Sequence, residues 1–174
     1  MGITFIQPLL DMPFLSRIRR NHGLEHASLH ILSERFPGIS LAGHSDTGGF
    51  WLLGNVPTTE VQSAVNEALR RLRAGERRLA IHPNCGTNFV TSGTLAGLAA
   101  GLAMFGGGRR LRDKVERLPL AASLATLALI AAQPLGLRLQ ETITTSGEPG
   151  ALEVVEIVPS RSGRLDVHRV VTRG

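Results

Sequence analysis

The sequence predicts an α+β domain that carries an inserted hairpin of two transmembrane helices. A chain of 174 residues is long enough for one domain with its own hydrophobic core. Two stretches near its middle, residues 87–108 and 118–137, contain no charged side chain. Each is close to the ~20 residues that a helix needs to cross a bilayer. The polar segments on both sides follow helix and strand patterns, which predicts one mixed domain interrupted by the hairpin.

The composition excludes several classes of protein. With 43% hydrophobic and 19% charged residues, the chain is too apolar for a disordered protein. Cys85 is the single cysteine, which excludes an internal disulfide and an all-cysteine metal cluster. The net charge is +5, but five of the 19 basic residues stand in the short run 109–117 between the apolar stretches. Because this does not form a basic surface on a polar domain, we expect no nucleic-acid partner.

The N-terminal polar part begins with a helix and a β-hairpin. Residues 13–36 place apolar side chains at helical spacing, and Pro37-Gly38 ends the pattern. Two short apolar runs, ISLAGHS and GFWLLGN, then stand on either side of a turn sequence at residues 46–49. This order is typical of a strand, a turn and a strand.

Further elements follow on both sides of the apolar stretches. Residues 58–73 predict an amphipathic helix, with Thr58 or Thr59 as its N-cap. The run RRLAIHP predicts a short strand that ends at Pro83. After the hairpin, three β-rich runs predict three strands: LQETITTS, ALEVVEIVP and LDVHRVVT.

This pattern divides the chain into three parts. Residues 1–86 form an N-terminal helix and strand part with a histidine-rich helix, residues 87–138 form the transmembrane hairpin, and residues 139–174 form C-terminal strands that pack on the N-terminal part. Antiparallel spans return the chain to the side of the membrane that it left. The two polar parts can therefore join into one domain.

The two apolar stretches differ in composition. The second is rich in leucine and alanine and lies between Arg117 and Arg138, whose long side chains can reach the lipid head groups. The first carries Gly93, Gly97 and Gly101 at intervals of four, which predicts a helix face for close packing against the second span, another copy or another membrane protein. The alternative is a soluble core with two buried helices, but few other apolar helices exist to enclose them.

The side of the membrane on which the polar domain lies follows from two opposed arguments. The positive-inside tendency puts the basic run between the spans in the cytoplasm and the polar parts outside. Residues 1–15 lack the features of a signal peptide, which favours an N-terminal part that stays inside. We expect a multi-pass membrane protein with its polar domain in the cytoplasm.

A candidate metal site lies in the first helix. His22, His26 and His30 follow at intervals of four, so neighbouring members lie one turn apart on one face. The segment His22-Gly23-Leu24-Glu25-His26 matches the pattern H-x-x-E-H, in which two imidazoles bind zinc and the glutamate takes a proton from the bound water. The alternative is an amphipathic helix whose histidines meet head groups or neighbouring carbonyls. The spacing predicts a zinc site with His22 and His26 as ligands and Glu25 as general base.

The third ligand is sought in a second group of residues, IHPNCGTN, before the first apolar stretch. His82 or Cys85 can supply it, and His30 and His168 are further candidates. Cys85 has a competing role as a nucleophile, because the N-terminus of a helix stabilises a thiolate. It is equally a candidate for a buried small apolar residue.

Several segments together resemble a known but uncharacterised family of small bacterial membrane proteins, a domain of unknown function. They are RNHGLEHASLHIL, LAGHSDTGGFWLLGNVP, EALRRLRAGE, LAIHPNCGTN and the closing HRVVT. The resemblance covers most of the chain and implies a bacterial plasma membrane and a joint role for the N-H-x-x-E-H and H-P-N-C-G-T-N segments. A separate local similarity to the inverted zinc proteases is limited to His22, Glu25 and His26.

Three functions are compatible with these patterns. The first is a membrane-bound, metal-dependent hydrolase, such as a peptidase, that uses the H-x-x-E-H helix. The second is a non-catalytic integral membrane protein in which the histidines hold a structural metal or meet an assembly partner. The third is a cysteine-dependent hydrolase or acyltransferase that uses Cys85.

Overall fold

The computed structural model describes residues 5–105, 108 and 110–174. The chain divides into two compact units, one formed by Met1–His82 with Glu141–Gly174 and the other by Pro83–Gln140. The first unit contains helices and a sheet, and the second is helical, so the α+β class is confirmed. The end of the first apolar stretch at residues 106–107 and Arg109 of the basic run lie outside the described residues.

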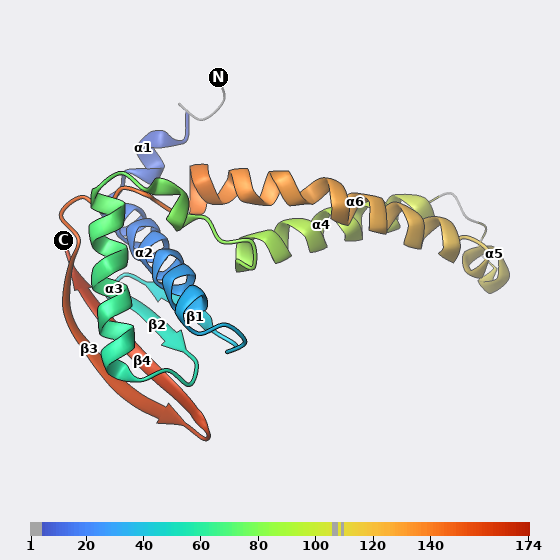
Figure 1. Ribbon diagram of the computed structural model, residues 1–174. Helices are drawn as coiled ribbons and strands as arrows, with labels where there is room; N and C mark the ends of the chain where they lie inside the picture. The colour runs from blue at the N-terminus through green and yellow to red at the C-terminus, as the bar shows by residue number, and fades with distance from the viewer. Residues whose placement is uncertain (1–4, 106–107, 109) are drawn as a thin grey trace. The chain divides into compact units, whose positions relative to one another are not determined.

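The α/β unit is built on a four-stranded antiparallel sheet in the order β1-β2-β4-β3 (Figure 1). Its strands are β1 Ala42–Asp46, β2 Gly49–Leu53, β3 Glu153–Ser162 and β4 Leu165–Arg173. The predicted N-terminal hairpin is confirmed, with Asp46 paired to Gly49 across the turn. Strand β2 pairs with β4, so the N-terminal and C-terminal hairpins join at the centre of the sheet.

Helices α2 and α3 pack on this sheet. The short α1 spans Gln7–Leu10, α2 spans Pro13–Arg35 and α3 spans Thr58–Arg73. Both longer helices agree with the sequence prediction, but Thr58 is the first residue of α3 and its N-cap is Pro57, without a side-chain cap. The core joins the inner faces of both helices to the sheet, and its largest fully buried apolar members are Phe50, Leu24, Leu32, Leu152, Val61, Val65 and Val170.

Two predicted strands are wrong. Arg77–Ala80 of the run RRLAIHP forms a short 3-10 helix (η1), and Gln140–Thr144 of the run LQETITTS forms a π-helical turn (η2). The C-terminal part therefore contributes two strands to the sheet, not three. Carbonyl groups in and next to both segments accept hydrogen bonds from side chains of α2, for example Ala80 from His26 and Thr144 from His22. These bonds replace the strand partner that a sheet would provide.

The helical unit consists of α4 Gly86–Met104, α5 Leu111–Val115 and α6 Leu118–Leu139, and α4 and α6 pack along each other. A buried pair of amides joins the start of α4 to the end of α6, because Gln140 Nε2 donates to Asn88 Oδ1 at 2.7 Å. Asn88 Nδ2 in turn donates to the carbonyl oxygen of Pro83 at 2.6 Å. At the same end, Gly136 lies against Asn88, and a Cβ atom there would be 3.1 Å from the Asn88 Cα.

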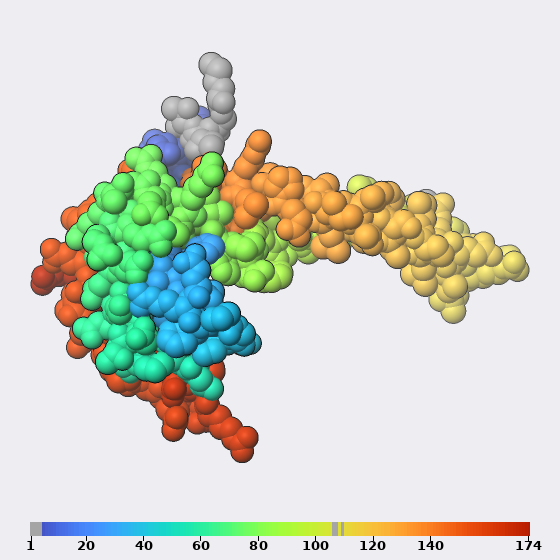
Figure 2. All heavy atoms as spheres, viewed as in Figure 1, coloured from blue at the N-terminus to red at the C-terminus, as the bar shows by residue number. Residues whose placement is uncertain are grey.

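Only one of the two predicted spans meets the length and composition of a membrane helix within the described part of the chain. It lies in the continuous helical stretch Leu111–Thr144. Helix α4 does not meet these criteria of length and composition, since threonine, asparagine and glycine dilute its apolar residues. Both helices nevertheless expose large apolar side chains, and α6 presents an open surface along the visible face of its unit (Figure 2).

The glycine stripe of α4 does not pack on α6. A Cβ atom built at Gly93, Gly97 or Gly101 would meet no atom of the described residues within 4 Å. The close approach between the two helices is instead at Gly136, on α6. The prediction that the stripe packs on the second span is therefore wrong, and contact with another copy or another membrane protein stays a prediction.

We expect Gly136→Leu to destabilise the helical unit, because the added side chain must displace Asn88. Overpacking of this kind costs about 1–3 kcal/mol. Gly97→Leu is the matched control, since a side chain at Gly97 enters open space. Thermal unfolding of both variants in detergent would measure the difference. A lower melting temperature for Gly97→Leu than for Gly136→Leu would contradict this packing.

We also expect His168 to make stability depend on pH. His168 is buried in β4, its Nε2 lies 3.1 Å from Thr58 Oγ1, and burial lowers its pKa, with Asp166 partly opposing the shift. The folded state therefore favours the neutral ring, while the unfolded ring has its ordinary pKa of ~6.5. This contribution is complete above pH ~6.5 and is lost as the pH falls through that value.

His168→Gln keeps a polar side chain beside Thr58 but removes the titration. Between pH 7.5 and 5, the melting temperature of the parent protein should fall more steeply than that of the variant. Parallel curves for the two proteins would show that His168 contributes nothing to the acid sensitivity.

Candidate metal centre

The histidines of α2 form a continuous row with His82. The ring centroids of His22 and His26 are 4.3 Å apart, which agrees with their spacing of one helical turn. The His82 ring is 5.7 Å from that of His26 and 4.8 Å from that of His30. Four imidazoles from two segments far apart in sequence thus lie side by side in the α/β unit.

Three of these rings are held by backbone carbonyl groups. His22 Nδ1 lies 2.9 Å from the carbonyl oxygen of Thr144, and His26 Nδ1 lies 2.8 Å from that of Ala80. His30 Nε2 lies 2.8 Å from the carbonyl oxygen of Ile81. A carbonyl oxygen only accepts hydrogen bonds, so each of these ring nitrogens carries the proton. The other ring nitrogen, Nε2 in His22 and His26, is then the unprotonated one when the ring is neutral.

This arrangement is the one that metal-binding histidines use. A ligating imidazole nearly always donates its second N–H to a carboxylate or a carbonyl, which fixes the tautomer and the direction of the ring. One ring nitrogen of His22 and one of His26 lie within 4.8 Å of each other. Two nitrogens bound to one zinc ion at 2.0–2.1 Å are about 3.4 Å apart, so small rotations of the rings are sufficient.

His82 is neutral at physiological pH. Burial, together with repulsion of the charged form by the neighbouring His30 and His26, lowers the pKa of His82 to about 4. A neutral imidazole is the form that binds a metal ion. His82 therefore fits the predicted role of a ligand, and the structure brings it next to His26.

Glu25 lies at the edge of the histidine row and faces strand β1. Its carboxylate accepts a short hydrogen bond from the Ser45 hydroxyl, and the absence of a side chain at Gly43 gives it room. Burial raises the pKa of Glu25, while Ser45, His22 and His44 partly oppose the rise. Sequence reasoning missed Ser45 and Gly43, because only the register of β1 against α2 brings them to this carboxylate.

Two further predicted residues, Cys85 and His168, belong to other elements. Cys85 belongs to the helical unit, where it is the N-cap of α4 and its Sγ accepts a hydrogen bond from the Thr87 N–H at 3.4 Å. It follows His82 by three residues along the chain. His168 faces Thr58 of α3 and does not join the histidine row.

Two asparagines have a structural role, Asn21 of the N-H-x-x-E-H segment and Asn88 of the H-P-N-C-G-T-N segment. Asn21 is fully buried, its Nδ2 donates to the carbonyl oxygen of Asp46, and its Oδ1 accepts from the Thr172 hydroxyl. It thereby ties α2 to the β1–β2 turn and to β4. Asn88 ties α4 to α6 in the same way. The motifs alone do not predict that these amides are buried, so their role in joining elements was not predicted.

Comparisons with known proteins agree with the resemblance drawn from the motifs. A family model described as a domain of unknown function, DUF6391, matches residues 17–157. An uncharacterised protein of Picosynechococcus sp. (strain ATCC 27264 / PCC 7002 / PR-6) is 38% identical over 154 residues, covering 83% of this chain and 72% of that protein. No solved structure matches the chain. The protein therefore belongs to the DUF6391 family.

Proposed function

We propose that this protein is a membrane-anchored metalloprotein whose histidine row binds one divalent transition metal, with zinc as the first expectation. The observation that carries the proposal is that carbonyl groups already hold His22, His26 and His30 in fixed tautomers. Histidines with this second hydrogen bond are oriented as metal ligands are. Imidazole ligands suit zinc and its neighbours in the transition series.

The proposed ligands are His22 Nε2 and His26 Nε2, with a third from His82 or Cys85. His82 has its ring beside that of His26. Cys85 supports the alternative because the chain connects it to His82 through only two residues. Three protein ligands leave one coordination position for water or substrate, as in catalytic zinc sites.

A hydrolytic reaction is the function that Glu25 favours. Among the described residues Glu25 makes no ion pair with lysine or arginine, and its carboxylate accepts a hydrogen bond from the neutral hydroxyl of Ser45. A buried carboxylate without a cationic partner keeps its capacity to accept a proton. The metal would supply the acidity of a bound water, and Glu25 would accept the proton from it. We propose a metal-dependent hydrolase, with a peptidase as the first candidate.

We further propose that α4 and α6 insert into the bilayer of a bacterial plasma membrane as a hairpin, with the α/β unit in the cytoplasm. Support comes from the apolar side chains that both helices expose, including Phe89 and Leu102 on α4 and Leu127 and Ile130 on α6. Such surfaces are costly in water and favourable in lipid. The Asn88–Gln140 pair supplies internal partners for polar groups at one end of the hairpin.

The metal proposal predicts that purified protein binds one zinc ion per chain and that His26→Ala loses it. Loss of one of three ligands leaves a set that holds zinc poorly. Glu25→Gln is the matched control, because it keeps the helix and the proposed ligands and should bind zinc almost as well. Titration of chelator-treated protein with zinc, followed by metal analysis, would measure both.

The same variants separate binding from catalysis. In a panel of peptide and ester substrates, Glu25→Gln should lose hydrolysis while it retains zinc. Hydrolysis that survives metal removal and disappears in Cys85→Ala would instead identify a cysteine hydrolase. Parent protein with well under one zinc per chain after incubation with the metal would refute the metal centre.

The membrane proposal predicts that the full chain stays in the membrane fraction during alkaline carbonate extraction. Ile130→Arg, in the exposed face of α6, should reduce this fraction, because a charge at the bilayer centre costs about 2.5–3.5 kcal/mol. Leu111→Arg in α5 is the control, since residue 111 precedes the proposed span. Release of the parent protein into the soluble fraction would refute insertion.

A further inference from the structure

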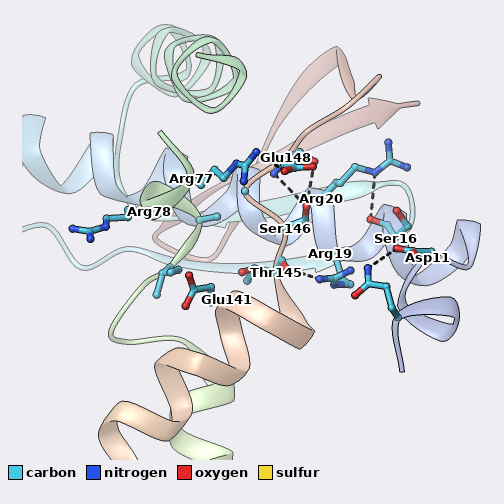
Figure 3. A pocket seen from close by; sticks show the side chains of 14 residues that line it. Asp11, Ser16, Arg19, Arg20, Arg77, Arg78, Glu141, Thr145, Ser146 and Glu148 are labelled. Carbon is cyan, nitrogen blue, oxygen red and sulfur yellow. Dashed lines mark hydrogen bonds and ion pairs between the residues drawn. The ribbon is translucent and has the colours of Figure 1, made fainter. Parts of the chain in front are cut away.

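A second candidate site is a cavity of about 530 Å³ in the α/β unit. Four arginines line it, Arg19 and Arg20 from α2 and Arg77 and Arg78 from η1. Figure 3 shows Arg20 beside Ser16, Arg19 beside Thr145 and Arg77 beside Glu148. None of these residues belongs to the histidine row.

The arginines of this cavity are only partly neutralised. Arg77 pairs with Glu148 at 2.6 Å, whereas Arg20 and Arg78 make no ion pair among the residues that the structure describes. Arg20 Nε donates to the carbonyl oxygen of Ser16, which orients the side chain and uses one of its five N–H groups. Arg19 Nη2 donates to the carbonyl oxygens of Thr142 and Thr145, while its buried Nε has no hydrogen-bond partner among the described residues. These guanidinium groups have unused donors for an anion, and their planar geometry suits phosphate oxygens.

The position of the cavity follows from the path of the chain. Ile81 and Glu141 both line it. The chain passes into the helical unit after His82 and returns at Glu141. If Pro83–Gln140 crosses the membrane as a hairpin, both junctions lie at the level of the lipid head groups, whatever the orientation of the α/β unit. The cavity then opens close to the phosphate layer.

Exposed apolar side chains surround the segment that forms one wall of the cavity. Gln7, Asp11 and Ser16 contribute to the wall. Phe5 is 95% exposed and Phe14 is 62% exposed, and Leu9 and Met12 are exposed by half or more. Large apolar side chains beside arginines are typical of segments that lie in the membrane interface.

We propose that this cavity binds the phosphate of an anionic phospholipid head group, while Phe5, Leu9, Met12 and Phe14 enter the interface. Arg19 and Arg20 bind the phosphate oxygens, and the apolar side chains contact the upper part of the acyl chains. The inference rests on the membrane insertion in the proposed function and adds the chemistry of the lipid that the α/β unit recognises.

The test uses the full chain in a neutral detergent with lipids presented as dispersed short-chain molecules. Dioctanoyl phosphatidylglycerol should bind as one molecule per chain by native mass spectrometry, about tenfold more tightly than dioctanoyl phosphatidylcholine. Arg20→Gln should remove most of this preference, and Arg20→Lys should retain part of it. Arg161→Gln, on the exposed β3, removes the same charge away from the cavity and should change nothing.

Equal binding of the two lipids would overturn the proposal. So would an equal loss of the preference for phosphatidylglycerol in Arg20→Gln and Arg161→Gln. Inorganic phosphate that competes at the same concentration as phosphatidylglycerol would assign the cavity to free phosphate and overturn the lipid assignment. The binding assay does not require a bilayer, so its failure is distinguishable from failure of the carbonate extraction. Protein that extracts as soluble but binds phosphatidylglycerol selectively would keep the lipid site and refute the membrane hairpin.

Discussion

The α/β unit depends on hydrogen bonds from polar side chains of α2 to backbone carbonyls of the segments around it. Arg17 donates to Thr172, Asn21 to Asp46 and His26 to Ala80. An unsatisfied buried carbonyl costs about 1–3 kcal/mol, so these segments fold where α2 supplies the donors. The helix thereby acts as a substitute for the strand partners that β1, η1 and the segment around residue 144 lack.

The same hydrogen bonds connect structure with the proposed chemistry. The carbonyls that His22 and His26 satisfy also decide which ring nitrogen is unprotonated. A helix with apolar residues at these positions could bury its face, but it would leave the carbonyls unsatisfied. The histidines therefore have a structural role as well as a proposed metal. A charged ring would still donate to its carbonyl but would have no lone pair for a metal ion.

Much of this fold could be predicted from periodicity. The patterns of α2, α3 and the β1–β2 hairpin identified elements that the structure confirms. The runs RRLAIHP and LQETITTS contain strand-forming residues but do not form strands. Side chains of α2 instead satisfy carbonyl groups in these runs. The i,i+4 spacing predicted the His22–His26 pair. The contact of Glu25 with Ser45 and the burial of Asn21 depend on which strand lies against α2, and a local pattern does not contain that information.

The pairing of β2 with β4 also determines the order in which the protein can form. The central strand pair joins residues 49–53 to residues 167–171, so the sheet is incomplete until the last part of the chain has been synthesised. The donor bond of His22 needs Thr144, which follows the whole of the helical unit. On a ribosome, α4 and α6 therefore emerge before the histidine row has its final hydrogen bonds. The fixed tautomer of His22 arises only after the apolar hairpin has left the ribosome, so the proposed membrane insertion would precede the proposed metal loading.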